Sequence, residues 1–338
     1  MEIKQNISLK PYNTFGINAT AKFFCEIKSV DDLRKALQLE GYSEKFVISG
    51  GSNMLITADI DALVMHINIK GISVEKDTPN HVELKIMAGE NWHQMVLHTL
   101  EQGYGGLENM SLIPGNTGTA PIQNIGAYGV ELKDTFVRCE AMNVQTQELE
   151  TFTKEDCEFG YRDSYFKNQG RGKYIITSVT LKLTKNNHKK NTSYGAIEAK
   201  LQEHGIKEPS IKDISNAVIA IRQEKLPDPT KLGNSGSFFK NPIITAEQFK
   251  KFYKKHPTAP FYKISDEAYK IPAGWLIEQC GFKGKRYGDA GIHKNQALVL
   301  VNHGEATGKE ILNLAYIIIE KVDQTFEIQI TPEVNIIK

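Results

Sequence analysis

Two glycine-containing segments of this sequence are suited to bind an anion through main-chain amides. Residues 113–132 read IPGNTGTAPIQNIGAYGVEL, with four glycines, two prolines and no charged side chain before Glu131. Residues 47–55 read VISGGSNML, in which a strand-like run leads into two glycines, a serine and an asparagine. Successive amides in such turns can form an anion-binding nest, and glycine lets a phosphate approach closely. Together the segments predict a diphosphate site, although a plain tight turn is the simpler interpretation of residues 47–55 alone.

The composition of residues 113–132 also raises the question of what keeps this loop ordered. Glycine gives up more backbone freedom on ordering than any other residue, and the segment offers few anchoring side chains. We therefore expect a bound ligand to hold the loop in place.

Other patterns with a known chemistry are absent or incomplete. No G-x-G-x-x-G follows a strand in the first hundred residues, so the fingerprint of a Rossmann dinucleotide fold is missing. HGEATGKE at 303–310 departs from the spacing of a phosphate loop, and its Thr307 and Glu310 fit a capping box that opens a helix. His93 and His98 would lie about 140° apart around one helix, on different faces, so they do not predict a metal site.

Charge and cysteine usage exclude several classes of function. The 338 residues carry 41 basic and 40 acidic side chains, and a net charge of +1 gives no global field that would attract nucleic acid or an anionic membrane. The four cysteines show no zinc-ligand spacing and no disulfide framework, so they are expected to be buried or idle thiols. The N-terminus lacks the apolar core of a signal peptide, and no run of about 18 apolar residues occurs, which predicts a cytoplasmic protein with no membrane partner. No obligatory protein partner is evident from the sequence.

Five motifs, spread in order over nearly the whole chain, resemble one enzyme family. They are PIQNIGAYGVEL at 121–132, YRDSYFK at 161–167, GNSGSFFKNP at 233–242, PAGWLIEQCGFKG at 272–284 and TPEVNII at 331–337. This set is similar to the UDP-N-acetylenolpyruvoylglucosamine reductases, the MurB family of peptidoglycan precursor synthesis, and to its longer, type I branch.

The resemblance implies an α+β flavoenzyme of three domains. Two of them would hold FAD in the vanillyl-alcohol-oxidase (PCMH-type) flavin fold, and a C-terminal α/β domain would bind the UDP-sugar. NADPH would reduce the flavin and leave, and the enolpyruvyl sugar would then take the same site and become UDP-N-acetylmuramate.

The same resemblance assigns three catalytic positions. Arg162 would bind the substrate carboxylate and the developing enolate, Ser237 would deliver a proton to C2, and Glu333 would polarise the carboxyl group. These residue types suit the chemistry, because hydride addition at C3 leaves negative charge at C2 that must be stabilised and then protonated. From the residues alone, Arg162 could instead pair with Asp163, Ser237 could be a turn serine, and Glu333 a solvated carboxylate.

The family's binding residues can likewise be placed on this sequence. Those expected around the FAD are Gly50, Gly51, Ser52, Asn53, Met54, Pro114, Gly115, Asn116, Thr117, Gly118, Thr119, Ala120, Gln123, Asn124, Gly126, Ala127 and Tyr128. Those expected around the UDP-sugar are Tyr128, Tyr194, Lys225, Asn241, Tyr262, Lys270 and Gln296, with Tyr194 as a lid. Capping and turn roles remain open for Lys225 and Asn241. Ser49 stands where many relatives have glycine, and it would be strained if its φ were positive.

The elements that must position these residues follow from the hydrophobic pattern. Helices are predicted after Ser29, from Trp92 to Leu100, and over 211–225, 244–255, 272–280 and 307–323. Strands are predicted over 23–27, 45–49, 82–89, 175–183, 236–240, 296–302 and 327–331, and residues 183–193 as a linker or hairpin tip.

We expect domains over 1–70 and 71–210 for FAD, with the Tyr194 segment inserted in the second, 211–326 for the substrate, and a C-terminal strand over 327–338. Two rival functions stay open. One is a flavin oxidase of the same fold acting on another sugar or alcohol, and the other is a flavin-free nucleotide-sugar binding protein.

Overall fold

The computed structural model describes residues 1–338 as two compact units, each of which is described by itself. Unit 1 comprises Met1–Ile7, Ala21–Gly50 and Asp61–Glu224, and unit 2 comprises Ser8–Thr20, Gly51–Ile60 and Lys225–Lys338. The domain boundaries drawn from the sequence stay predictions. No helix is both long and apolar enough to span a membrane.

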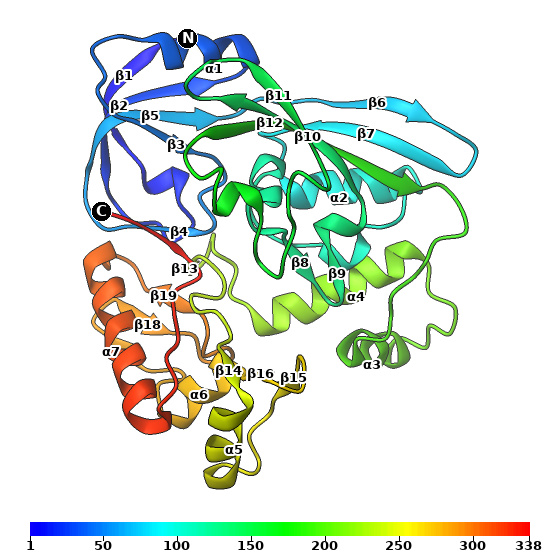
Figure 1. Ribbon diagram of the computed structural model, residues 1–338, viewed down its shortest axis with the longest axis vertical. Helices are drawn as coiled ribbons and strands as arrows, with labels where there is room; N and C mark the ends of the chain where they lie inside the picture. Colours follow the sequence, from blue (N-terminus) through cyan, green and yellow to red (C-terminus); the bar gives the residue numbers. More distant parts are fainter. The chain divides into compact units, whose positions relative to one another are not determined.

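Unit 1 is built on two sheets. The first has the strand order β1-β2-β5-β3 and the second, β11-β10-β12-β7-β6 (Figure 1). The strands are β1 (Ile3–Ser8), β2 (Thr20–Ile27), β3 (Lys45–Ile48), β5 (Ile60–Ile67), β6 (Ile72–Asp77), β7 (His81–Met87), β10 (Phe136–Asn143), β11 (Leu149–Thr153) and β12 (Tyr174–Thr184), with a two-residue hairpin β8 (Gly126–Ala127) and β9 (Val130–Glu131).

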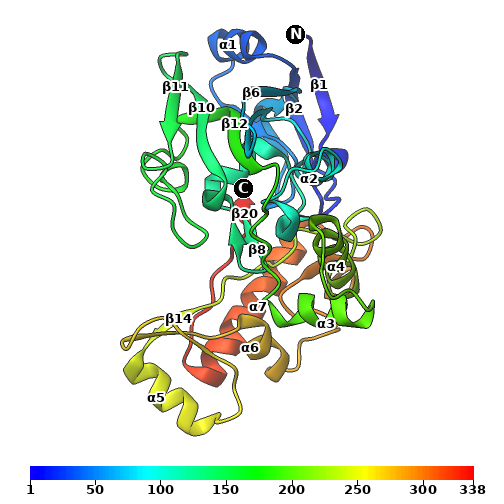
Figure 2. The same cartoon turned by 90° about the vertical axis from the view of Figure 1, so that its right-hand side faces the viewer.

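The central strand β12, predicted over 175–183, is buried on both faces along most of its length. It lies between antiparallel β10 and β7, and Figure 2 shows β10 and β12 next to each other. Ser178 and Thr180, on the face opposite to Val179, are buried as well. Polar side chains therefore sit inside this sheet and are satisfied by hydrogen bonds such as that from Ser178 Oγ to Glu140 Oε2 (3.0 Å).

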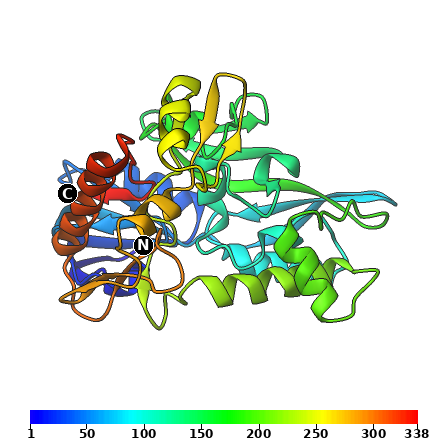
Figure 3. The same cartoon turned by 90° about the horizontal axis from the view of Figure 1, so that it is seen from below.

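The helices of unit 1 are α1 (Val30–Gln38), α2 (Trp92–Glu101), α3 (Gly195–Glu203) and α4 (Ile211–Lys225). The predicted start of α1 is confirmed, because Ser29 Oγ accepts a hydrogen bond from the Asp32 amide (3.0 Å). The predicted α2 and α4 are also confirmed. Helix α3 was not predicted; it packs against α4 through Ile197, Leu201 and Ile214 (Figure 3).

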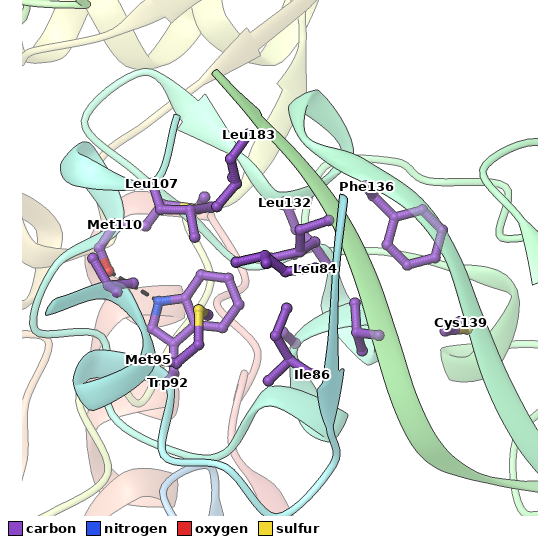
Figure 4. Packing of buried hydrophobic residues seen from close by; sticks show 14 of the residues in the cluster. Leu84, Ile86, Trp92, Met95, Leu107, Met110, Leu132, Phe136, Cys139 and Leu183 are labelled. Atoms are coloured by element: carbon purple, nitrogen blue, oxygen red, sulfur yellow. Dashed lines mark hydrogen bonds between the residues drawn. The ribbon is translucent and has the colours of Figure 1, made fainter. Parts of the chain in front are cut away.

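The core around α2 fixes the start of the glycine-containing loop. Trp92 is buried among Leu84, Ile86 and Leu107, and its indole Nε1 donates to the Met110 carbonyl (3.0 Å; Figure 4). Because Met110 stands three residues before Ile113, this contact ties the entrance of the loop to the core.

Unit 2 carries three small sheets. Their orders are β13-β19-β18-β17, β14-β16-β15 and the parallel pair β20-β4. The strands are β4 (Met54–Ile56), β13 (Gly233–Asn234), β14 (Ile243–Thr245), β15 (Tyr262–Lys263), β16 (Ala268–Lys270), β17 (Arg286–Tyr287), β18 (Ala290–Ile292), β19 (Leu300–Asn302) and β20 (Asn335–Ile337), and the helices are α5 (Ala246–Lys255), α6 (Ala273–Gln279) and α7 (Gly308–Phe326). The predicted capping box of Thr307 and Glu310 is present at the start of α7.

Three strand predictions in unit 2 were wrong in extent or place. Residues 236–240 form only an isolated bridge from Phe239 to Pro332, because the chain turns at Gly236, which has a φ of 67°. The strand predicted over 296–302 is confined to β19. Residues 327–331 form no strand, since Glu327 caps α7 with a φ of 56°, and the C-terminal strand is β20, further along the chain.

Candidate active site

The two turns expected to bind a diphosphate touch each other within unit 1. A Cβ atom added at Gly50 would lie 2.7 Å from the Gly115 Cα and 3.0 Å from the Asn116 nitrogen. Such distances are below van der Waals contact, so only glycine allows this approach of two main chains. The two turns thus meet through bare backbone, which is compatible with the diphosphate site that the sequence predicts.

The loop from residue 113 to 132 is held by the protein itself, so the expectation that a ligand alone anchors it was wrong. The amide of Trp92 donates to the Gly115 carbonyl (3.0 Å), that of Thr117 to Glu90 (2.8 Å) and that of Gly118 to Ala88 (3.0 Å). Part of the loop forms a 3-10 helix, Thr117–Gln123, in which Ala120 and Pro121 are buried.

These bonds also narrow the set of amides that can face a phosphate. The amides of Thr117 and Gly118 donate to the carbonyls of Glu90 and Ala88, just after β7, so they are less available to a phosphate than expected. At the other end of the loop, the Asn124 side chain donates to the Gly160 carbonyl (3.0 Å) and accepts from the Lys133 amide (3.1 Å). Asn124 therefore serves to fix the loop.

Ser49 connects the two turns and is not strained. It is not among the residues with positive φ, and its Oγ accepts a hydrogen bond from Asn116 Nδ2 (3.1 Å). The departure from glycine at this position thus adds a contact between the turns.

Arg162 and Tyr128 are brought together by the hairpin β8–β9. Tyr128 and Gly129 form its turn, and both have positive φ, 50° and 81°, as a two-residue hairpin loop requires. Arg162, itself at a φ of 54°, donates from Nη2 to the Gly126 carbonyl (2.7 Å) at the base of this hairpin. Asp163 instead accepts from Asn168 Nδ2 (3.0 Å). Aromatic and arginine side chains at positive φ are uncommon, which indicates a constrained site.

Tyr194 lies against Tyr128, with ring centroids 5.2 Å apart and the planes at 83°. Tyr194 precedes α3 as its N-cap residue and keeps about half of its surface exposed. Tyr128 is packed on the pair α3 and α4, and burial raises the pKa of its hydroxyl.

Two further residues belong to this cluster and were not predicted. Arg222, on α4, lies beside Tyr128. Burial lowers the pKa of its guanidinium, Tyr128 opposes this shift, and the charge of Arg162 adds to it. His93, on α2, accepts at Nδ1 from the Leu112 amide (2.9 Å), and burial, followed by the charge of Arg222, lowers its pKa. A single arginine on an amphipathic helix gives no sequence signal that distinguishes it from a solvated one.

In unit 2, Ser237 and Glu333 lie on neighbouring segments. The Glu333 amide donates to the Phe238 carbonyl (2.7 Å), and the Lys240 amide to that of Thr331 (3.0 Å). Ser237 is exposed between Gly236 and the buried Phe238. The Ser237 hydroxyl is thus exposed on a segment that is fixed by the buried Phe238, and this segment lies next to the one that carries Glu333.

The segment Gly51–Met54 is joined to the same part of unit 2. The Asn53 carbonyl accepts from the amide (3.1 Å) and the Nδ2 atom (2.9 Å) of Asn335, just beyond Glu333. Ser235 Oγ donates to the Met54 carbonyl (3.2 Å). The turn after Gly50 is therefore held by the C-terminal segment and by the Ser237 loop.

Four of the residues expected around the UDP-sugar lie in unit 2 near α6 and the sheet β14-β16-β15, namely Asn241, Tyr262, Lys270 and Gln296, whereas Tyr128 and Tyr194 lie in unit 1. Asn241 Oδ1 accepts from the Ala273 amide (2.9 Å), and Gln296 Oε1 from that of Leu298 (3.3 Å). Lys270 pairs in register with Tyr262, and its Nζ lies 5.3 Å from the ring centroid. Lys225 is exposed at the end of α4. Asn241 has the capping role that the sequence left open.

Two family models match the chain. The model described as "FAD binding domain" matches residues 21–151 and that described as "UDP-N-acetylenolpyruvoylglucosamine reductase, C-terminal domain" matches residues 228–337. The predicted FAD-binding fold is thereby confirmed, and the first match includes Gly50, Gly115 and Tyr128.

Similar proteins carry the name given by the second of these models. A UDP-N-acetylenolpyruvoylglucosamine reductase of Flavobacterium johnsoniae is 59% identical over 337 residues and covers 100% of both chains, and one of Pseudomonas fluorescens is 47% identical over 99% of both. A solved structure of the reductase from Thermus caldophilus has a TM-score of 0.69 at 22% identity over 100% of each chain, and shows the shared fold. The chain therefore belongs to the UDP-N-acetylenolpyruvoylglucosamine reductase family, as its five motifs predict.

Proposed function

We propose that this protein is an FAD-dependent oxidoreductase that uses NADPH to reduce the enolpyruvyl group of UDP-N-acetylenolpyruvoylglucosamine, giving UDP-N-acetylmuramate for peptidoglycan synthesis in the cytoplasm. The observation that carries the proposal is the 59% identity to a reductase of this name over the full length of both chains. The contact between Gly50 and Gly115 supports it independently, because the two turns meet through bare backbone at the site predicted for the cofactor diphosphate.

The side chains at hand suit the charge changes of this reaction. Bound FAD supplies hydride transfer. Arg162, held by the Gly126 carbonyl, binds the substrate carboxylate with a planar set of donors and stabilises the negative charge that spreads into it. Glu333 polarises the carboxyl group.

Ser237 acts as the general acid that protonates C2. A serine hydroxyl is a weak acid, but the enolate of a carboxylate is a strong base, so the proton transfer is not badly mismatched. The exposed position of Ser237 beside the buried Phe238 leaves its hydroxyl accessible to a ligand.

The experiment that tests this proposal separates the two half-reactions of Ser237→Ala in an anaerobic stopped-flow instrument. Flavin bleaching by NADPH needs no proton at C2 and should change little. Reoxidation by the enolpyruvyl sugar should slow by about 10²- to 10⁴-fold, the usual contribution of a general acid. Equal slowing of both half-reactions would contradict the role of Ser237, and a wild-type protein that the sugar does not reoxidise would contradict the proposed function. Ser43→Ala, at an exposed position, is the matched control.

A further inference from the structure

Arg222 is a half-buried cation, and the groups that act on its charge include no carboxylate. Its Nε atom is buried and has no hydrogen-bond partner. Within unit 1, the groups that influence its charge besides burial are Tyr128 and Arg162, and neither is a carboxylate. A buried donor atom of a guanidinium is costly to leave unpaired unless an acceptor meets it, so this position favours a ligand that brings negative charge.

The groups around Arg222 are arranged as donors. A guanidinium has donors only, so beside Arg222 the phenol oxygen of Tyr128 can serve only as an acceptor, and the phenol hydrogen remains available for another group. His93 accepts the Leu112 amide at Nδ1, which places the proton of the neutral ring on Nε2. Arg162 brings a second guanidinium to the same hairpin, through Gly126.

We propose that Arg222 is a second substrate-binding arginine, which together with Tyr128 and Arg162 receives the carboxylate of the enolpyruvyl group. The inference rests on the proposed function, because that function identifies the carboxylate as the anion that Arg162 binds. A planar carboxylate offers the several acceptor sites that this set of donors requires. Arg222 would stabilise the charge that the reaction places on that group, and it would keep Tyr128 oriented for the same purpose.

Two ligands distinguish a carboxylate from the other anions of the substrate. The enolpyruvyl sugar carries both the carboxylate and the diphosphate, whereas UDP-N-acetylglucosamine carries the diphosphate alone. Binding of each to the oxidised, FAD-loaded protein is measured by calorimetry, without turnover, for the wild type, Arg222→Gln and Arg222→Lys. Arg171→Gln, at an exposed arginine of the same unit, is the matched control.

The wild type must first bind the enolpyruvyl sugar; if it does not, the proposed function fails before Arg222 is tested. We expect Arg222→Gln to weaken binding of that sugar by about 10- to 100-fold, the span for a hydrogen bond to a charged group, and to leave binding of UDP-N-acetylglucosamine within about twofold. Arg222→Lys, which keeps the charge, should recover part of the loss.

Three results would overturn the inference. They are unchanged binding of the enolpyruvyl sugar, equal weakening of both sugars, which would assign Arg222 to the diphosphate, and no recovery in the lysine variant. Flavin content and melting temperature are measured for each variant. If Arg222→Gln does not hold FAD, the affinities of the two sugars for Arg222→Lys are compared instead. We then expect a weaker affinity for the enolpyruvyl sugar and an unchanged affinity for UDP-N-acetylglucosamine.

Discussion

At Gly50 the absence of a side chain decides whether two turns can meet. The sequence indicated this contact, because glycine-containing turns without charged residues suggest a site made of backbone. It could not show that Ser49 would join the turns through Asn116, since that bond depends on a contact between residues 67 positions apart. Arg222 was missed for a similar reason, because its burial comes from the packing of α4 near Tyr128 and not from its neighbours in the chain.

Gly50→Ala should weaken FAD binding while the protein stays folded. The added methyl group would lie 2.7 Å from the Gly115 Cα, and both partners are backbone, so the turns must separate. Such overpacking costs about 1–3 kcal/mol. If this cost falls on the two turns at the FAD site, FAD affinity should decrease by about 5- to 150-fold. The measurement is titration of the flavin-free protein with FAD, followed by flavin fluorescence.

Gly195→Ala is the control for that experiment. A Cβ at Gly195 meets nothing within 4 Å, and its φ is not positive, so the FAD affinity should be unchanged. Equal affinities of wild type and Gly50→Ala would show that the contact between the turns plays no part in cofactor binding.

Among the elements, helices with a capping residue and an apolar face were found where the sequence predicts them. Short strands were not, because β13, β19 and β20 have two or three residues each and owe their conformation to pairing with distant segments. The loop from residue 113 to 132 shows the same limit. Its composition suggests disorder, but its order comes from Glu90, Ala88 and other carbonyls that only the fold brings to it.

One polar cluster in the five-stranded sheet predicts a dependence of stability on pH. Glu140 on β10 accepts from Lys85 on β7 (2.8 Å) and from Ser178 on β12 (3.0 Å). Burial acts to raise the pKa of this carboxyl, but the bonds from Lys85 and Ser178 outweigh it, and the pKa lies below its ordinary value of 4.5. A carboxylate with a lowered pKa stabilises the fold above its unfolded pKa and ceases to do so as the pH falls through the folded one.

Glu140→Gln should therefore lower the free energy of unfolding at pH 7 by about 0.5–1 kcal/mol, the range for partly exposed ion pairs. The difference from wild type should begin to shrink as the pH falls below about 4.5, where the unfolded chain binds the proton, and it should be lost as the pH passes through the lower pKa of the folded protein. Urea unfolding at a series of pH values measures both effects, with exposed Glu148→Gln as the control. A difference that stays constant down to pH 3 would mean that the charge of Glu140 does not contribute.

For the whole molecule, the family assignment and the FAD-binding domain could be predicted because five motifs in order are hard to obtain by chance. The detailed roles of Arg162, Ser237 and Glu333 follow from that resemblance and from the charge changes of the reaction. The sequence does not show which contacts hold these residues, such as the Gly126 carbonyl at Arg162 and the pairing of residues 238–240 with 331–333. Those depend on segments that are distant along the chain.

The most direct test of the account follows the flavin spectrum of the purified protein under anaerobic conditions. We predict that the protein carries FAD, that NADPH bleaches its visible absorption, and that the enolpyruvyl sugar then restores it with formation of one UDP-N-acetylmuramate per flavin. A colourless protein that cannot be loaded with FAD, or a reduced flavin that oxygen reoxidises but the sugar does not, would contradict the account.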